Sequence, residues 1–422
     1  MPVEPQTSPR LRTIAREWTR IGCIGFGGPP AHVSLLRELC VTRRGWLSDE
    51  QFERALAAVN LLPGPASTQL AIYCAWRLRA NRGALLGGVC FVLPGLVLIL
   101  ALSTLFLSGS PPLWVRGAGM GAGAAVPAVA LAAGWGVAQP ILARARARAR
   151  AAGGDCARDP LASGALARAL AYGLAGALAA ATLGAYLVAV LLACGAIELT
   201  CRAAARRAAL GLHAWPLAGV ALARRSLLAA PAPLLAAAAA APAGTGALAW
   251  TAFKVGALAF GGGFVIVPLM QADAVGTYHW MTHAQFLNAV ALGQLTPGPV
   301  TQTVAAVGYS AGGLGGGLLA ALVAFAPSFS FVLIGAARFE RLLADARVLA
   351  FLAGAAPAAA GAILGAAVPL AGALAVWWQY ALLGAAVIAL LVLRRGIVPT
   401  LLCAGAIGTV AVLAGAPAVS GA

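Results

Sequence analysis

Charge is scarce in this sequence, and acidic residues are scarcer still. Only 10% of its 422 residues are charged, with 12 Asp and Glu against 29 Lys and Arg, whereas 61% are hydrophobic. A soluble chain of this size could not cover so much apolar surface with so few polar groups. The composition therefore excludes a soluble globular protein and predicts an integral membrane protein.

Metal-binding and redox motifs are missing as well. The eight cysteines are scattered without a Cys-x-x-Cys pair, and the four histidines are equally dispersed. We therefore expect no metal site, no disulfide framework and no cofactor. The basic stretch at 143–150, ARARARAR, lies between apolar runs without stacking aromatics. We attribute it to the Arg excess of cytoplasmic loops and expect no nucleic-acid partner.

Long apolar runs are present instead. Residues 83–107, 114–142 and 318–337 each reach the roughly 18 to 20 apolar residues that a helix needs to cross a bilayer. The N-terminus has basic residues but no apolar core, so it is not a cleaved signal peptide. We expect an all-α polytopic protein that crosses the lipid bilayer many times and keeps its N-terminus in the cytoplasm.

The chain also contains a tandem repeat. RIGCIGFGG at 20–28 resembles KVGALAFGG at 254–262, which places Phe26 and Phe260 234 positions apart. The same separation carries WLSDEQF onto WMTHAQF and LLPGPAST onto LTPGPVTQ without a gap. These landmarks predict two homologous halves, residues 10–142 and 250–416. Residues 143–249 would connect them with a basic loop, a hairpin of two spans and another span after Arg225.

The distribution of arginine predicts how the halves are oriented. In the first half, arginines flank the Pro-Gly-Pro segment on both sides: Arg37, Arg43, Arg44, Arg77, Arg79 and Arg82. The equivalent stretches of the second half, 271–283 and 308–317, have no Lys or Arg, and the basic residues follow only at 338–347. Because Lys and Arg mark the cytoplasmic side, the halves should form an inverted repeat, which is typical of transporters.

Two Pro-Gly-Pro segments should interrupt helices within the membrane. About 12 residues precede and follow the first segment, so each arm reaches roughly 18 Å, near the middle of a 30 Å core. We expect re-entrant or broken helices there. Irregular backbone at that depth is tolerated only where protein, water or a substrate meets its polar groups.

Polar residues follow both segments, and the free N–H groups of a first helical turn attract anions. Glycines of the two Phe-Gly-Gly segments would allow close backbone approach, with a cation at a matched position beside each. We therefore predict an oxyanion site built from Arg20, Gly27, Gly28, Pro63, Gly64, Pro65, Ser67, Thr68, Gln69, Lys254, Gly261, Gly262, Gly263, Gln294, Thr296, Pro297, Gly298, Pro299, Thr301, Gln302 and Thr303.

Three further residues or motifs were weighed against simpler interpretations. A cation such as Lys254 costs roughly 2.5 to 3.5 kcal/mol at mid-membrane, so it needs either an anionic substrate or a carboxylate supplied by folding. The nearest acidic residue in sequence is Asp273, 19 positions away. His32 aligns with Ile266 in the repeat, so it is either specific to the first half or a surface histidine, and we favour a surface histidine. The glycines of GAGMGAGAA at 117–125 are interpreted as a helix-packing motif and not as a dinucleotide fingerprint.

At these motifs the sequence resembles the chromate ion transporter family in its long two-domain form. The segments that carry the resemblance are FGGPPAHVSLL, LLPGPASTQLAIY, FKVGALAFGGGFVIVPLM and LGQLTPGPVTQT. The resemblance implies export of chromate across the bacterial inner membrane, driven by the proton motive force, and hence chromate resistance. Its implied partners are chromate or a related oxyanion and protons, and a homodimer is one assembly that the sequence leaves open.

Three alternatives stay open at this point. Sulfate is a tetrahedral dianion of similar size to chromate, so a sulfate or other oxyanion carrier of the same fold is the main one. A membrane-embedded reductase would need redox ligands or a nucleotide site, which the motifs do not offer. A channel would need a continuous lined pore and not two facing half-helices.

Overall fold

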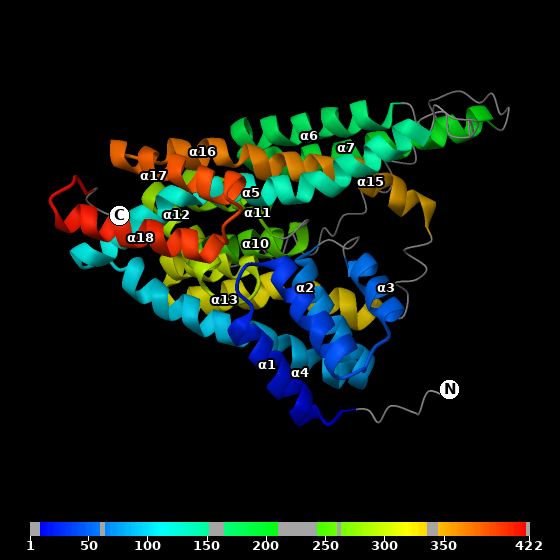
Figure 1. Ribbon diagram of the computed structural model, residues 1–422, viewed down its shortest axis with the longest axis horizontal. Helices are drawn as coiled ribbons and strands as arrows, with labels where there is room; N and C mark the ends of the chain where they lie inside the picture. The colour runs from blue at the N-terminus through cyan, green and yellow to red at the C-terminus, as the bar shows by residue number, and fades with distance from the viewer. Residues whose placement is uncertain are drawn as a thin grey trace.

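The computed structural model describes residues 9–59, 64–151, 164–209, 243–259, 263–335 and 345–418, and these form helices, turns and loops with no strand among them (Figure 1). The earlier helices are α1 (Leu11–Ile24), α2 (Pro29–Arg37), α3 (Asp49–Val59), α4 (Ala66–Phe106), α5 (Leu113–Ala151), α6 (Ala165–Thr182) and α7 (Leu187–Ala209). The later ones are α10 (Ala243–Leu258), α11 (Ile266–Gln271), α12 (His283–Leu295), α13 (Thr303–Gly335), α15 (Ala346–Gly365), α16 (Ala367–Gly372), α17 (Trp377–Val387) and α18 (Ile397–Leu413). This confirms the all-α fold class.

The two halves repeat the same succession of elements. Helix α1 corresponds to α10, α2 to α11, and α3 to α12, each pair starting close to 234 positions apart. A π-helix of six residues follows α2 and α11 at matched positions, η1 (Glu38–Arg43) and η4 (Ala272–Thr277). Because π-helical turns are rare, their recurrence at one separation is strong structural support for the repeat.

Helices α4 and α13 each consist of two parts that double back on one another. The backbone leaves the helical conformation at a sharp turn, where Ala80 has φ 46° and Gly313 has φ 60°. The parts on either side of the turn touch closely, since a Cβ on Gly83 would overlap the carbonyl oxygen of Ala75. Helix α13 makes an equivalent contact across its own turn. The first part of each helix is therefore short, and the second is the long one.

The register of the repeat changes by one residue after the Pro-Gly-Pro segments. The turns at Ala80 and Gly313 are 233 positions apart, as are Pro94 and Pro327 within the long parts of the two helices. A 3-10 turn, η5 (Val300–Gln302), precedes α13, whereas α4 begins without one. The gap-free alignment is therefore wrong beyond the Pro-Gly-Pro segments: Thr68 and Gln69 correspond to Thr301 and Gln302.

The packing is crosswise: helices of the connecting region cover the second half, and the last helices of the second half cover the first half. Helices α6 and α7 form the hairpin expected in the connecting region, and both pack against α15 of the second half. Helices α17 and α18 pack in the same way against α5 of the first half. Figure 1 shows α6, α7 and α15 along one side of the molecule and α18 beside α5. The span expected after Arg225 lies outside the described residues.

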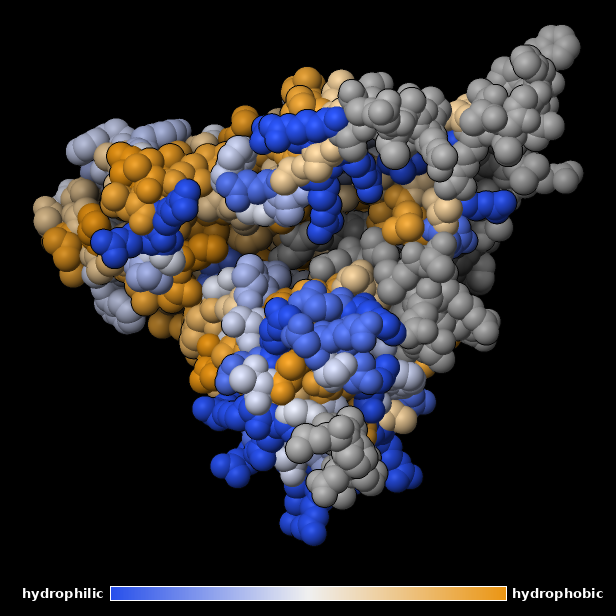
Figure 2. Space-filling view, turned by 45° about the vertical axis from the view of Figure 1, so that its right-hand side comes forward, coloured by the Kyte–Doolittle hydropathy of each residue, from blue (hydrophilic) through white to orange (hydrophobic). Residues whose placement is uncertain are grey.

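The outer surface suits a bilayer. Within the described residues, six helices are long and apolar enough to cross a membrane. The long part of α4 exposes a stripe of apolar side chains at every fourth residue, Leu85, Val89, Leu93 and Val97. Figure 2 shows hydrophilic residues gathered at the lower end of the molecule, where Figure 1 places α1. An apolar belt next to polar ends is typical of a membrane protein.

Small residues let the helices pack closely, as expected in a lipid bilayer, where the hydrophobic effect does not drive helices together. On α5, Gly117 and Gly121 face α18, where a Cβ on Gly121 would overlap the carbonyl oxygen of Ala404. Gly119 and Gly123 of the same helix face α12, with the amide of Asn288 beside Gly119. The packing interpretation of this glycine run is confirmed.

Candidate functional site

The first Pro-Gly-Pro segment separates α3 from α4. Gly64 has φ 120°, which side-chain-bearing residues rarely adopt, and Pro65 is the N-cap of α4. The three polar residues that follow, Ser67, Thr68 and Gln69, are almost wholly buried in the first turn. Four N–H groups at a helix start lack intrahelical acceptors. Buried polar side chains therefore surround a set of available backbone donors.

The second segment lies between α12 and α13 with the same geometry. Gly298 has φ 107°, and Pro299 is extended and precedes the 3-10 turn η5. Thr301, Gln302 and Thr303 are fully buried. The hydroxyl of Thr303 donates to the carbonyl of Val300 at 2.8 Å, so this hydroxyl already has a hydrogen-bond partner within its own turn.

Each Pro-Gly-Pro segment is completed by a helix of the opposite half. Gly95, which follows Pro94 in α4, lies so close to the second segment that a Cβ there would overlap the carbonyl oxygen of Pro297. Gln302 reaches across it, and its Nε2 donates to the carbonyl of Val92 at 2.8 Å. A helix of the first half thus supports the polar turn of the second.

The reciprocal contact joins the first segment to α13. Ser328 follows Pro327 there, and a Cβ built on Gly64 would lie 3.4 Å from its Oγ. Gly95 and Ser328 are absent from the residues that the motifs predict. The signal that could have found them is the pair of prolines 233 positions apart, each followed by a small residue at a polar break.

The Phe-Gly-Gly segment of the first half is tied to the second Pro-Gly-Pro segment. The N–H of Gly298 donates to the carbonyl of Gly25 at 3.0 Å. His32 Nε2 lies 2.8 Å from the same oxygen, so this nitrogen carries the proton and donates. The prediction of a surface histidine is wrong, because His32 is fully buried and packs edge-on against Phe91. The burial of His32 depends on tertiary contacts, which a comparison of the two repeats cannot predict.

Gly27, Gly28 and Gly263, at or next to the Phe-Gly-Gly segments, adopt backbone conformations that favour glycine. Gly27 and Gly28 have φ 98° and 75°, and Gly28 lies near Val300. Gly263 has φ 91°, and a Cβ on it would lie 3.6 Å from Thr301 Oγ1. The structure therefore brings glycines of both halves to the second break. Gly261, Gly262 and Pro63 lie outside the described residues.

Several buried polar atoms at the two breaks have no hydrogen-bond partner within the described structure. They are Thr68 Oγ1, Thr301 Oγ1, Ser328 Oγ, Gln302 Oε1 and, from the turn before the second break, Gln294 Nε2. Native proteins leave few such groups unpaired, because each costs roughly 1 to 3 kcal/mol. Thr296, in contrast, donates to the carbonyl of Leu292 at 3.0 Å. The arrangement offers hydroxyl donors to a polar ligand.

The two predicted cations are engaged elsewhere. Lys254 Nζ lies 2.5 Å from Asp273 Oδ2, and the hydroxyl of Thr251 donates to the same oxygen at 2.9 Å. Their side chains are 18% and 6% exposed. Folding thus supplies the partner that the local sequence lacks, so no substrate is needed to compensate Lys254. Arg20 is exposed on α1.

A second ion pair of reversed polarity joins the equivalent elements of the first half. Glu17 on α1 accepts from Arg43 at 2.9 Å and from Arg44 at 2.7 Å, both at the end of η1. Burial alone would raise the pKa of Glu17, but the hydrogen bond from Arg44 and the charges of Arg43, Arg44 and Arg20 together lower it. In each half an ion pair therefore joins the first helix to the π-helix. The acidic partner lies on the helix in the first half and on the π-helix in the second.

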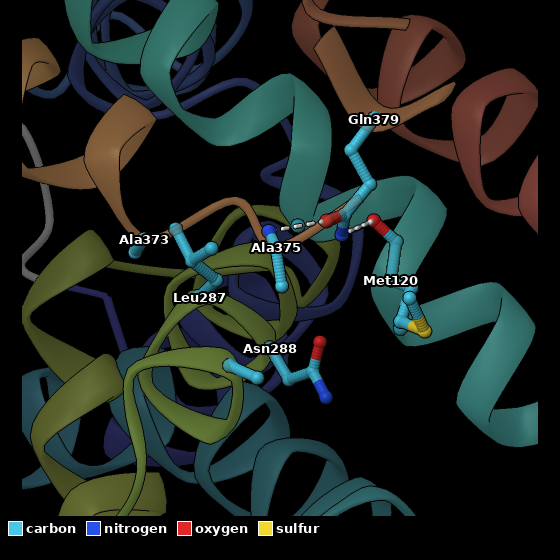
Figure 3. A pocket seen from close by; sticks show the side chains of 9 residues that line it. Met120, Leu287, Asn288, Ala373, Ala375 and Gln379 are labelled. Atoms are coloured by element: carbon cyan, nitrogen blue, oxygen red, sulfur yellow. Dashed lines mark hydrogen bonds between the residues drawn. The ribbon is translucent and has the colours of Figure 1, made fainter. Parts of the chain in front are cut away.

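A small pocket between α5, α12 and α17 is separate from this site (Figure 3). Gln379 spans it: its Oε1 accepts from the N–H of Ala375 at 3.0 Å, and its Nε2 donates to the carbonyl of Met120 at 3.1 Å. None of the lining residues belongs to a Pro-Gly-Pro or Phe-Gly-Gly segment. Gln379 acts here as a brace between helices.

Comparison with known proteins identifies the family. The model of the family described as chromate transporter matches residues 12–241 and 246–410. The chain belongs to the chromate transporter family. The first match extends through the region that connects the two predicted halves, and the two segments agree with the repeat seen in the fold. The protein is accordingly a membrane transporter and not a member of an enzyme family.

Curated relatives extend the similarity over most of the chain. A chromate transport protein of Cupriavidus metallidurans is 30% identical over 404 residues, which cover 95% of this chain and 93% of the relative. A chromate transport protein of Pseudomonas aeruginosa is 30% identical over 85% of this chain and 80% of its own length. A probable chromate transport protein of Synechococcus elongatus is 27% identical over 85% and 84%. No solved structure matches the chain.

Proposed function

We propose that this transporter exports chromate across the bacterial inner membrane in exchange for protons and so confers chromate resistance. The observation that carries the proposal is the set of buried, unpartnered hydroxyls at the two Pro-Gly-Pro breaks. Hydroxyl and backbone N–H donors at a helix start suit an oxyanion, as helix N-termini do in many anion sites. The relatives named above supply chromate as the particular oxyanion.

The proposed site lies where the two halves meet. Its donors are the N–H groups that follow Pro65 and Pro299, with the hydroxyls of Thr68 and Thr301. Gly28 and Gly263 let the backbone lie in contact with the second break. The described polar residues at both breaks are buried. Transport then requires a rearrangement that opens the site to one side at a time.

The inverted repeat is part of the same proposal. The swapped arginine loops support opposite orientations of the halves, with the N-terminus in the cytoplasm. Opposite halves would present two breaks to one substrate from opposite faces. Such an arrangement supports alternating access around a fixed site, as in other transporters built from inverted repeats.

Transport into inside-out membrane vesicles tests this function. With an acid lumen, protons leave down their gradient, and labelled chromate should accumulate above the level of vesicles that lack the protein. Collapse of the pH gradient should abolish the accumulation. Chromate uptake equal to that of the empty vesicles would refute the proposal. Faster uptake of sulfate than of chromate would assign the site to the sulfate alternative.

A further inference from the structure

Ser328 is a buried hydroxyl that its own helix does not satisfy. Hydroxyls in apolar helices usually bond back to a carbonyl three or four residues earlier. In this chain Ser103 donates to the carbonyl of Ile99 at 2.7 Å, and Thr182 donates to that of Leu178 at 2.7 Å. Ser328 is fully buried in α13, yet its Oγ has no hydrogen-bond partner within the described residues. A helix-stabilising role does not account for it.

The position of Ser328 points to the first Pro-Gly-Pro segment. Its Oγ would lie 3.4 Å from a Cβ on Gly64, the residue at the centre of that break. Thr68, four residues after Gly64 and also fully buried, offers a second hydroxyl without a partner. Two unsatisfied donors, one from each half of the chain, therefore accompany the same helix start.

The pseudo-equivalent position in the other half has no hydroxyl. Gly95 stands where α13 has Ser328, and its lack of a side chain leaves room for Pro297 and Gln302. At that break Gln302 Nε2 donates to the carbonyl of Val92, and the N–H of Gly298 donates to the carbonyl of Gly25. Among the described residues at that break, the Thr301 hydroxyl and Gln294 Nε2 are the buried side-chain donors without an acceptor. The two breaks are thus alike in backbone but different in chemistry.

We propose that Ser328 contacts the substrate directly. Its Oγ–H donates a hydrogen bond to one oxygen of a tetrahedral oxyanion at the first break, and the hydroxyl of Thr68 donates to another. This assignment rests on the proposed transport function. We place the oxyanion at the first break because its two unpartnered donors are both hydroxyls and come from opposite halves of the chain.

The test compares Ser328→Ala with Ser103→Ala, which removes a buried hydroxyl of another helix that is bonded to its own backbone. A hydrogen bond to an anion is stronger than a neutral one, so Ser328→Ala should raise the half-saturation concentration for chromate uptake about tenfold. It should also weaken the stabilisation of the purified transporter by added chromate, while its melting temperature without chromate stays equal or rises. Ser103→Ala should leave the half-saturation concentration unchanged.

A structural role for Ser328 predicts the opposite pattern, with a lower melting temperature and an unchanged half-saturation concentration, and this result would overturn the proposal. Ser328→Cys keeps a weak donor of similar size and should give an intermediate increase. If Ser328→Ala fails to assemble, wild-type affinity in Ser328→Cys overturns the proposal and the intermediate increase supports it. Failure of the transport function itself is visible in the wild type, which would then take up no chromate, and the same comparison is made with sulfate.

Discussion

Within the described residues, the polar side chains that we place at the two Pro-Gly-Pro breaks are uncharged. Thr68, Thr301 and Ser328 place hydroxyls there, whereas the ammonium of Lys254 is held by Asp273. In a poorly solvated site, a fixed cation would hold a dianion strongly. A carrier must also release its substrate, and hydrogen bonds from uncharged groups offer recognition with a smaller electrostatic barrier to release. We therefore assign Lys254 to the architecture of the second half.

The ion pair between Lys254 and Asp273 can be tested by charge removal. Breaking a buried pair costs about 3 to 5 kcal/mol because one charge is left without a partner. Lys254→Gln and Asp273→Asn should therefore each lower the melting temperature in detergent and the amount of inserted protein. The double variant should recover most of the melting temperature and most of the inserted protein. Its half-saturation concentration for chromate should be close to wild type. A double variant that is stable but has lost affinity for chromate would instead assign Lys254 to the substrate site.

The polar residues after the Pro-Gly-Pro segments could be predicted from the sequence because they recur beside a recognisable break. Ser328 and Gly95 have only the weaker signal of their matched prolines, since they reach the breaks through packing of α4 against α13. The one-residue change of register also concealed the correspondence of Thr68 with Thr301. His32 was misassigned for the same kind of reason, because its burial depends on Gly25 and Phe91.

At the scale of elements, each broken helix is backed by a proline-containing helix of the other half. Proline removes a backbone donor from a helix, and Pro94 and Pro327 lie in the long parts of α4 and α13 beside the breaks. The small residue that follows each proline sets how closely the break can approach. Gly95 allows backbone contact with Pro297, and Ser328 places a hydroxyl beside Gly64.

Addition of one methyl group at Gly95 should therefore disturb the second break. A Cβ there overlaps the carbonyl oxygen of Pro297 and the amide of Gln302, and overpacking of this kind costs about 1 to 3 kcal/mol. Gly95→Ala should reduce chromate uptake at least tenfold in vesicles that contain equal amounts of protein. Gly136→Ala, in α5 with open space around the new methyl group, is the control and should transport normally. Normal uptake by Gly95→Ala would show that the second break tolerates displacement.

At the scale of the whole molecule, the halves are interlocked. The hairpin of α6 and α7 from the connecting region covers α15 of the second half, and α17 with α18 of the second half covers α5 of the first half. The repeat of the early elements could be predicted because its landmarks keep one separation in sequence. The crosswise packing could not, since Ala-rich helices present nearly the same small residues on every face and so do not specify their neighbours.

The orientation of the halves is a prediction for the whole chain, and two equivalent turns make a sharp test of it. Arg82 and Gly315 are both exposed just after the turns of α4 and α13 and are 233 positions apart, in the register of those turns. Cysteine is introduced at each position separately after the eight native cysteines are replaced. A membrane-impermeant maleimide added to spheroplasts should label Gly315→Cys and spare Arg82→Cys, because the arginine-rich turn stays on the cytoplasmic side. In inside-out vesicles the pattern should reverse. Labelling of both cysteines from the same side would refute the inverted repeat, since two halves that face the same way place both turns on one side of the membrane.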